Sequence, residues 1–537
     1  MTTEFPIGKT LHDAAPQTAR SDSPQLHTPK PWIFPTRSIA IRLFFTCWLV
    51  YSVHVATNTV REIFPALAMA DHFSFRLDEY ANFSPDLFEK PGYGWHITGN
   101  PGASMLAAIP YFLSRPIVDP IVAAVNRSRA ANHNEPPSYN SPWPMAREFY
   151  RQAWRRGFDV KFGLAAVIMQ TFCMAPISAL GVVAMFYLLG YLFGSDRAAF
   201  WLALLYAFGT PVFYRAALLN QNMMIGHFSL MALMAMWNPG GSRRLKETTR
   251  YLLAGLAGGM AVLLDYSGAI VLLGLFCYAV SRMWARGSLV KNAHIWRFAL
   301  GATVPVAFLL FYQWKCFGNP LYPCEHWMPE PAWQAAMGYR GFTLPQLHLF
   351  LQLLGDYRFG IFTTCPLLLL SICALWMDRG TRRVFPARES IAMWSISAAL
   401  ILFFSGWTSV WMQFTYGMRY LAPLLPFLYL LTAVVMVRMP RRLALLLASL
   451  AVTQAWCMAM YRDVERGFGV FDPVLRVFIG GFQLPALTVF ARMSGQYGDY
   501  AAMGVSPLAI FAVVAAIIAV IWSGRRLVVP PVPEGTR

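Results

Sequence analysis

The sequence predicts an all-α polytopic membrane protein with about 12 transmembrane helices. Of its 537 residues, 57% are hydrophobic and 13% are charged, whereas soluble domains carry about 25% charged residues. Apolar runs recur along most of the chain, and a helix needs about 20 such residues to cross the hydrocarbon. Lys and Arg lie in short clusters between these runs, as they do in the cytoplasmic loops of membrane proteins.

The apolar runs give the approximate positions of the membrane helices. They extend over 39–59, 160–192, 197–214, 223–238, 251–266, 268–284, 297–315, 360–377, 390–407, 419–437, 443–461 and 506–523. Residues 1–37 before them are polar and contain proline, and we expect a disordered cytoplasmic tail there. Residues 525–537 form a second expected tail behind the membrane domain 38–524.

Basic clusters orient the predicted helices. They are Arg243, Arg244, Lys246 and Arg250; Arg282, Arg286, Lys291 and Arg297; Arg379, Arg382, Arg383 and Arg388; Arg438, Arg441 and Arg442; and Arg525 and Arg526. All fall on the same side of the membrane if both termini are cytoplasmic. The net charge of +18 does not indicate nucleic acid as a partner, because no single basic domain gathers it.

The long loops fall on the opposite, outer side and cover residues 60–158, 316–359 and 462–505. In the first of them, Pro144–Phe158 has the pattern of an amphipathic helix lying on the membrane surface, with its arginines near lipid phosphates. In the second, a disulfide is open to Cys316 and Cys324, although spacing alone does not establish it.

Two polar residues stand inside or beside apolar runs. We interpret Asp265 as part of a tight outer turn between two helices, although a charge at membrane depth would indicate function. We interpret His227 as a packed, hydrogen-bonded helix residue rather than a ligand.

The first outer loop carries the residues best suited to chemistry. Asp78 and Glu79 are adjacent carboxylates shortly after the first membrane helix, and His72 and His96 lie nearby in the sequence. A sugar hydroxyl is a poor nucleophile near neutral pH, and a positioned carboxylate accepts its proton as the new bond forms. Solvated loop charges are the simpler interpretation of the pair when it is taken alone.

The acidic pair does not stand alone, because further stretches follow it in a characteristic order. They are 206–213, 258–266, 357–362 followed by Pro366, and 417–426. Together with the pair, they resemble the GT-C superfamily of membrane glycosyltransferases, which includes protein O-mannosyltransferases and lipid A aminoarabinose transferases. The resemblance extends over most of the chain from about residue 40 to about residue 430.

The resemblance implies an activity and roles for residues. The catalytic carboxylate would be Asp78, with Glu79 orienting it or binding a metal. The donor would be a polyprenyl phosphate monosaccharide, and the acceptor a glycan, lipid or protein at the outer face of the cytoplasmic (inner) membrane. Some members use a divalent metal beside the acidic pair, for which His72, His96 and Glu62 are the candidates here.

A polyprenyl phosphate leaving group calls for cations, and arginine binds phosphate oxygens in pairs. The arginines expected at outer helix ends are Arg61, Arg215, Arg340, Arg358 and Arg419. Arg358 and Arg419 are favoured because they lie in family stretches, and Arg61 and His96 complete the expected phosphate site. Each arginine is equally explained as an interfacial anchor that reaches lipid phosphates.

Other functions remain open from the sequence. A transporter or flippase of lipid-linked sugars would need polar residues at the midplane of broken helices, whereas the charges here gather at helix ends. An O-antigen polymerase or ligase would carry its large loop late in the chain, and an inactive relative would serve as a scaffold. The sequence has no P-loop and no GxGxxG after a strand, so a lipid-linked donor is favoured over a nucleotide sugar.

Overall fold

The computed structural model describes most of the chain between residues 36 and 523. The described ranges are 36–56, 60–132, 135–136, 139, 141, 144–241, 244–284, 293–330, 338–380, 383–411, 417–461, 469–493 and 506–523. Both predicted tails therefore lie outside the described residues, except that helix α1 begins at Thr36.

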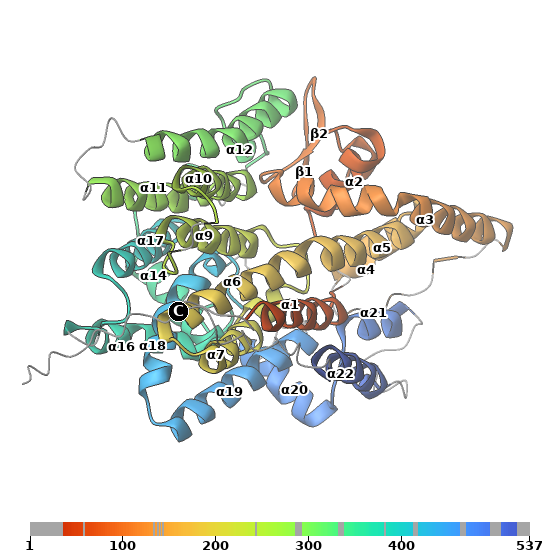
Figure 1. Cartoon of the computed structure of the whole chain (residues 1–537). Coiled ribbons are helices and arrows are strands. Elements are labelled where there is room, and N and C mark those ends of the chain that lie inside the picture. The colour runs from red at the N-terminus through yellow and green to blue at the C-terminus, as the bar shows by residue number, and fades with distance from the viewer. Residues whose placement is uncertain are drawn as a thin grey trace, which may run out of the picture.

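Helices make up most of the described chain (Figure 1). The first third contains α1 (Thr36–Val53), α2 (Ile63–His72), the 3-10 turn η1 (Asp78–Tyr80), β1 (Leu87–Lys90), β2 (Gly94–Ile97), α3 (Gly102–Asn132), α4 (Pro144–Arg155), α5 (Asp159–Met169), the π-helical turn η2 (Gln170–Met174) and α6 (Ala175–Phe193). The middle contains α7 (Asp196–Phe208), α8 (Val212–Arg215), α9 (Gln221–Trp237), α10 (Glu247–Leu264), α11 (Gly268–Trp284), α12 (Ala293–Phe317) and η3 (Cys324–His326).

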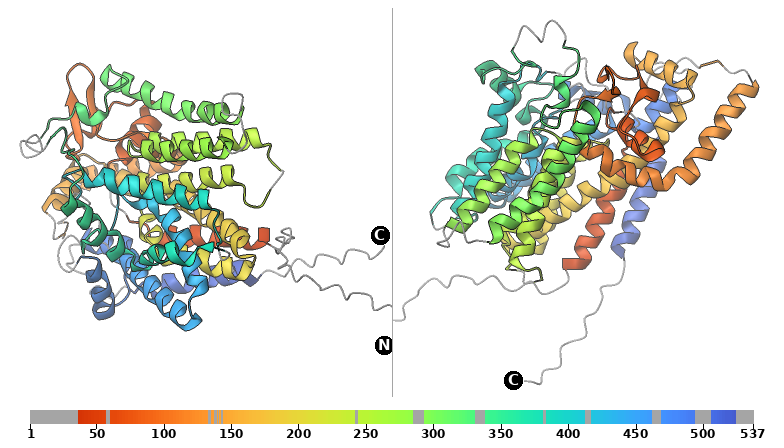
Figure 2. Two further views of the ribbon diagram at one scale, coloured as in Figure 1. Left: turned by 90° about the vertical axis from the view of Figure 1, so that its left-hand side faces the viewer. Right: turned by 90° about the horizontal axis from the view of Figure 1, so that it is seen from above.

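The last third contains α14 (Leu347–Gly355), α15 (Ile361–Thr364), η4 (Pro366–Leu369), α16 (Leu370–Met377), α17 (Ala387–Ser405), η6 (Ala422–Leu424), α18 (Leu425–Arg438), α19 (Arg441–Met460), η7 (Gly469–Phe471), α20 (Asp472–Gly480), α21 (Pro485–Met493) and α22 (Leu508–Ser523). A helix lies in each of the ranges expected from the sequence. The helices form a bundle whose members run roughly along one axis (Figure 2).

Five described helical segments are long and apolar enough to cross a membrane: Gly102–Asn132, Asp159–Phe193, Ala293–Phe317, Ala387–Ser405 and Arg441–Met460. A sixth is possible if α20 and α21, which are bent by 73° relative to each other, form one broken span or a re-entrant loop. Shorter apolar helices include α11 and α22. The chain is therefore a mostly helical protein with several potential membrane helices, and twelve spans remain a prediction.

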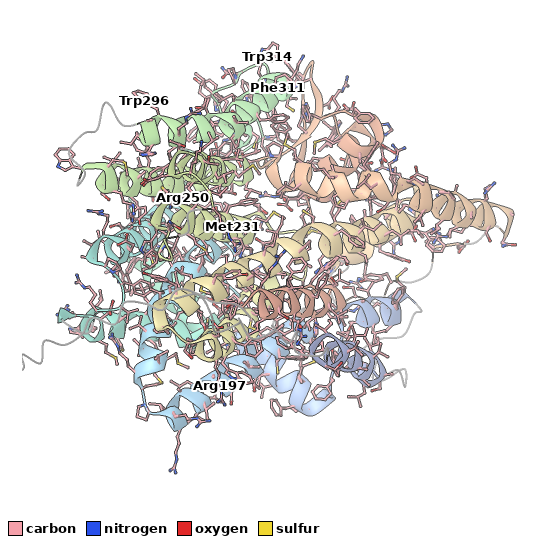
Figure 3. All side chains as sticks on the ribbon, in the orientation of Figure 1. Arg197, Met231, Arg250, Trp296, Phe311 and Trp314 are labelled. Carbon is pink, nitrogen blue, oxygen red and sulfur yellow. The ribbon has the colours of Figure 1, made fainter. Side chains whose placement is uncertain are left out.

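Helix α12 shows the side-chain pattern of a membrane span (Figure 3). Trp296 and Trp314 are both more than half exposed and lie near its two ends. They are 18 residues apart, or about 27 Å along a helix, close to the roughly 30 Å of a hydrocarbon core. Tryptophan is enriched where membrane and water meet, so this spacing fits a helix that crosses the bilayer.

The described parts of the basic clusters gather at one end of the bundle. Arg282 at the end of α11 pairs with Glu389 at the start of α17, at 3.0 Å. Arg438 at the end of α18 pairs with Asp378 after α16, at 3.3 Å. We call this end the basic end, and these pairs match the expectation that the basic clusters share one side.

The first predicted outer loop, 60–158, is more structured than expected. It contains an antiparallel hairpin, β1 and β2, in which Phe88 pairs with His96, so the prediction of an all-α protein is wrong at this point. It also contains the 31-residue helix α3, although Pro110, Pro116 and Pro120 lie inside it. Because proline usually ends helices in soluble proteins, these three prolines prevented the prediction of α3 from the sequence. The amphipathic helix expected over 144–158 is present as α4.

The opposite end of the bundle carries the hairpin, and we call it the hairpin end. Asp265 lies there between α10 and α11, where its carboxylate accepts the Ser267 N–H at 2.9 Å, as expected for a tight turn. Asn100, just after the hairpin, donates to the Val262 carbonyl at 2.6 Å. The hairpin is thus fixed to the end of α10.

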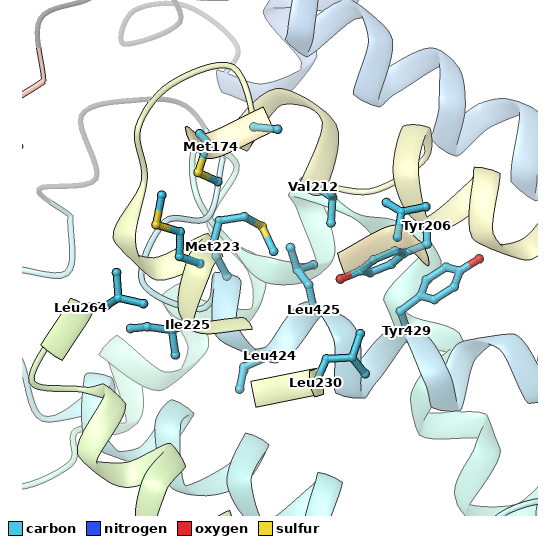
Figure 4. Packing of buried hydrophobic residues seen from close by; sticks show 14 of the residues in the cluster. Met174, Tyr206, Val212, Met223, Ile225, Leu230, Leu264, Leu424, Leu425 and Tyr429 are labelled. Atoms are coloured by element: carbon cyan, nitrogen blue, oxygen red, sulfur yellow. The ribbon is translucent and has the colours of Figure 1, made fainter. Parts of the chain in front are cut away.

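The core is built from close helix contacts. Tyr206 of α7 and Tyr429 of α18 have ring centroids 5.0 Å apart, and Val212 of α8, Leu230 of α9 and Leu425 of α18 lie near this pair (Figure 4). Helices α10 and α12 approach through glycines, because a Cβ at Gly255 would lie 1.9 Å from the Phe298 carbonyl oxygen. Small residues at such contacts allow membrane helices to pack backbone to backbone.

We expect Gly255→Ala to lower the melting temperature of the protein in detergent micelles. The added carbon overlaps the α12 backbone, and overpacking of this kind costs about 1–3 kcal/mol. Gly163→Ala in α5 is the matched control, because nothing lies within 4 Å of its added carbon and Ala favours helix by up to about 1 kcal/mol. Equal melting shifts in the two variants would contradict the close α10–α12 contact.

Candidate functional site at the hairpin end

Asp78, the expected base, lies at the start of η1 and faces the hairpin. One carboxylate oxygen accepts the Trp95 backbone N–H at 2.8 Å, and the other pairs with Arg76 at 2.8 Å. Its side chain is 47% exposed. A Cβ at Gly94 would lie 2.6 Å from this carboxylate, so glycine is needed for the close approach. Asp78 therefore holds strand β2 through the Trp95 N–H, and its carboxylate is also accessible to solvent.

Glu79, next in the chain, has a different set of partners. Its carboxylate lies 3.0 Å from His72 Nε2, at the end of α2. Its backbone carbonyl accepts a hydrogen bond from Arg156, which also donates to the Ala81 carbonyl at 2.9 Å. The two carboxylates are thus fixed to different neighbours.

Arg61 stands at the centre of a second polar cluster. Its guanidinium lies 3.0 Å from the carboxylate of Glu62 and 3.7 Å from that of Asp86, and it donates to the Thr98 hydroxyl at 3.3 Å. Glu62 is nearly buried, with 7% of its side chain exposed, whereas Asp86 is 41% exposed. Arg61 therefore joins a buried carboxylate to one that solvent reaches.

The cluster continues into the loop after α12. The Gly99 N–H donates to Cys324 Sγ at 2.9 Å, and the Cys324 thiol donates to Glu325 at 3.2 Å. The hydroxyl of Tyr266 accepts the Cys324 N–H at 3.1 Å and the Gln313 amide at 2.5 Å. We call the residues Arg61, Glu62, Asp86, Thr98, Gly99, Tyr266, Cys324 and Glu325 the Arg61 network.

Electrostatics connect these groups further. Burial raises the pKa of the Glu325 carboxyl, and Asp265 adds to this effect, whereas Arg61 opposes it. Burial also raises the pKa of Tyr420, whose environment includes the charges of Arg419, Arg61, Asp265 and Asp86. Segments far apart in the sequence thus share one electrostatic environment at the hairpin end.

The other expected arginines fall into two groups. Arg215 is buried and donates to the carbonyls of Met418 and Gly417 at 3.0 and 2.6 Å. The Gly417 N–H donates in turn to the Arg358 carbonyl at 2.9 Å, so the segments bearing Arg215, Arg358 and Arg419 meet. The Arg358 guanidinium pairs with Asp356 at 3.1 Å. Arg340, in contrast, donates to the carbonyls of His326 and Met328 in its own loop.

The candidate metal ligands are not brought together. His96 is buried on β2, with its ring 5.2 Å from that of Phe317, and burial lowers its pKa. His72 pairs with Glu79, and Glu62 pairs with Arg61. Within the described ranges, no group of three or more His, Cys, Asp and Glu side chains could hold a metal ion.

The structure decides one possibility that the sequence left open and corrects one expectation. The disulfide between Cys316 and Cys324 does not form, and both cysteines are buried and free. Cys324 is instead held by Gly99 and Glu325, and Cys316 packs beneath the hairpin among aromatic rings. His227 is buried as expected, but its ring nitrogens have no hydrogen-bond partner among the described residues.

Sequence reasoning missed most of the Arg61 network. Asp86 and Glu325 lie in no motif of the sequence, whereas Tyr266 ends the stretch 258–266 that resembles GT-C enzymes. The one available signal was the set of polar residues that directly follow apolar runs, such as Asp265–Ser267. No family model, no curated protein and no solved structure matches this chain.

We expect Glu325→Gln to change the pH dependence of stability. Because the pKa of Glu325 is raised in the folded state, its stabilising effect is full below its ordinary pKa and is lost as pH rises through the folded pKa. Glutamine stays neutral, so the variant should melt like wild type near pH 4 and at a higher temperature near pH 8. Glu89→Gln on the exposed face of β1 is the control, and a melting difference that does not vary with pH would contradict the raised pKa.

Proposed function

We propose that this chain is a membrane glycosyltransferase. It transfers a monosaccharide from a polyprenyl phosphate donor to a glycan, lipid or protein of the cell envelope, at the outer face of the cytoplasmic membrane. The observation that carries the proposal is the Arg61 network, which gathers a cation and several carboxylates at one end of an apolar bundle. Such a reaction needs both a carboxylate base and a cation beside the bilayer.

The proposed reaction is a single displacement. The acceptor hydroxyl oxygen attacks the anomeric carbon while the bond from that carbon to the phosphate oxygen breaks, and the anomeric centre is inverted. The hydroxyl proton goes to a carboxylate, and the electron pair of the broken bond goes to the polyprenyl phosphate. Arginine stabilises this developing negative charge because its fork binds phosphate oxygens in pairs.

Two carboxylates compete for the role of base. Asp78 is the residue to which the family resemblance points, but both of its oxygens already have partners. Asp86 is comparably exposed, and its described cation partner is Arg61 at the looser distance of 3.7 Å. An arginine between a buried and an exposed carboxylate is well placed to exchange its outer partner for a phosphate. The proposal therefore includes Asp78 and Asp86 as the two candidates.

The test is sugar transfer by purified full-length protein in lipid nanodiscs. A panel of radiolabelled polyprenyl phosphate monosaccharides is offered together with membrane-extract acceptors to wild type, Asp78→Asn, Asp86→Asn and Asp119→Asn. Asn keeps the size of Asp but does not accept a proton at neutral pH, so the variant that lacks the base should lose roughly 100-fold or more in rate. Asp119, on the exposed side of α3, is the control and should keep wild-type activity.

Loss in only one of the two variants identifies the base. If both variants transfer sugar at the wild-type rate, neither residue is the base and Glu79 is next to be changed. If wild type consumes no donor but moves lipid-linked sugars across liposome membranes, the enzyme proposal fails and the transporter alternative replaces it.

A further inference from the structure

Helices α11 and α12 enclose an apolar groove of about 450 Å³ on the side of the bundle. Helix α11 lines it with Leu272, Leu273 and Phe276, and α12 with Ala299, Thr303 and Ala307. The hydroxyl of Thr303 donates to the Ala299 carbonyl at 2.9 Å. The groove therefore offers hydrocarbon contacts, and its one hydroxyl already has a partner.

The neighbouring helices hold the groove open. Helix α12 is fixed to α10, since a Cβ at Gly301 would lie 2.1 Å from the Leu252 carbonyl oxygen. Helix α11 is fixed to α17, where a Cβ at Gly274 would lie 2.4 Å from Ile396 Cγ1. Both walls are therefore packed against other helices, α12 against the backbone of α10 and α11 against the Ile396 side chain of α17.

The groove faces the region that hydrocarbon would occupy. Helix α12 lies on the outside of the bundle (Figures 1 and 3) and is one of the segments suited to cross a membrane. Leu273, which lines the groove, is 62% exposed, and Val304, next in the chain to the lining residue Thr303, is 60% exposed. These side chains would face hydrocarbon if α11 and α12 cross a membrane. A hydrocarbon chain is thus the natural occupant.

One end of the groove reaches the Arg61 network. At this end the groove is lined by Ala269 of α11 and Leu310 of α12. The Ala269 N–H donates to the Tyr266 carbonyl, and Leu310 lies about one helical turn before Gln313. Tyr266 and Gln313 are hydrogen-bonded to each other, and Tyr266 is also bonded to Cys324. At the other end lie the rings of Phe276 and Phe298, with centroids 6.1 Å apart. A chain in the groove therefore has one polar exit, toward the network.

We infer that this groove holds the isoprenoid chain of the lipid-linked substrate, with the phosphate end directed toward the Arg61 network. This inference rests on the proposed function. A polyprenyl phosphate presents a single apolar chain with a phosphate at its end, which matches an apolar groove whose polar exit leads toward Arg61. The first isoprene units lie between α11 and α12, and the rest of the chain extends into the bilayer.

The test is photo-crosslinking of full-length protein in nanodiscs. One sample contains a polyprenyl phosphate with a diazirine on its isoprenoid chain, and a second contains a phospholipid with a diazirine on an acyl chain. The polyprenyl probe should label peptides from α11 and α12, and unlabelled polyprenyl phosphate should compete. Equal labelling of these peptides by the phospholipid probe, without such competition, would show an ordinary lipid contact and overturn the inference.

Thr303→Trp fills the groove, and Val304→Trp places the same ring beside it on the same helix as the matched control. The filled variant should lose the polyprenyl crosslink and raise the donor KM roughly tenfold or more, while the control keeps wild-type values. Unchanged crosslinking and KM in Thr303→Trp would overturn the groove but leave the transferase intact. A competed crosslink that Thr303→Trp abolishes, in a protein that transfers no sugar, would support the groove while the proposed function fails.

Discussion

The guanidinium of Arg61 is the group on which the hairpin end depends. It faces the carboxylates of Glu62 and Asp86 together with the Thr98 hydroxyl, and so joins the start of α2 to the segments before and after the hairpin. Burial disfavours its charge, but Asp86 and Glu62 outweigh this and raise its pKa. Arg61 is mostly buried and has two carboxylate partners. If a phosphate binds to Arg61 in place of Asp86, Glu62 remains its partner and the carboxylate of Asp86 is released.

The rest of the bundle places this cluster and keeps it rigid. Glycine contacts bring α10 and α12 to backbone distance, and the turn between α10 and α11 presents Asp265 and Tyr266 next to the hairpin. Basic side chains occupy the other end, where Arg282 and Arg438 pair with Glu389 and Asp378. The molecule thus has a basic end, an apolar body with a side groove, and a mixed polar end where a cation meets carboxylates.

The positions of the helices could be predicted from the sequence, because each apolar run of helix length is visible without knowledge of its tertiary contacts. The turn at Asp265 and helix α4 were also predictable, since polar residues between apolar runs and amphipathic spacing are local features. Helix α3 was missed because its prolines mimic breaks. The pairing of Arg61 with Asp86 and the contact of Gly99 with Cys324 join segments that only the folded chain brings together. No periodicity encodes such contacts, so the site could be only partly anticipated, through Arg61, Glu62 and the stretch that ends at Tyr266.

The proposed reaction requires the hairpin end to face outward, where a flipped lipid-linked sugar is presented. The most direct measurement is labelling of single cysteines by a membrane-impermeant maleimide in intact cells, after Cys277 and Cys373, the exposed native cysteines, are replaced by alanine. Glu89→Cys on the hairpin should react from outside, whereas Arg441→Cys at the basic end should react only after permeabilisation. The reverse pattern would put the Arg61 network in the cytoplasm and contradict transfer at the outer face.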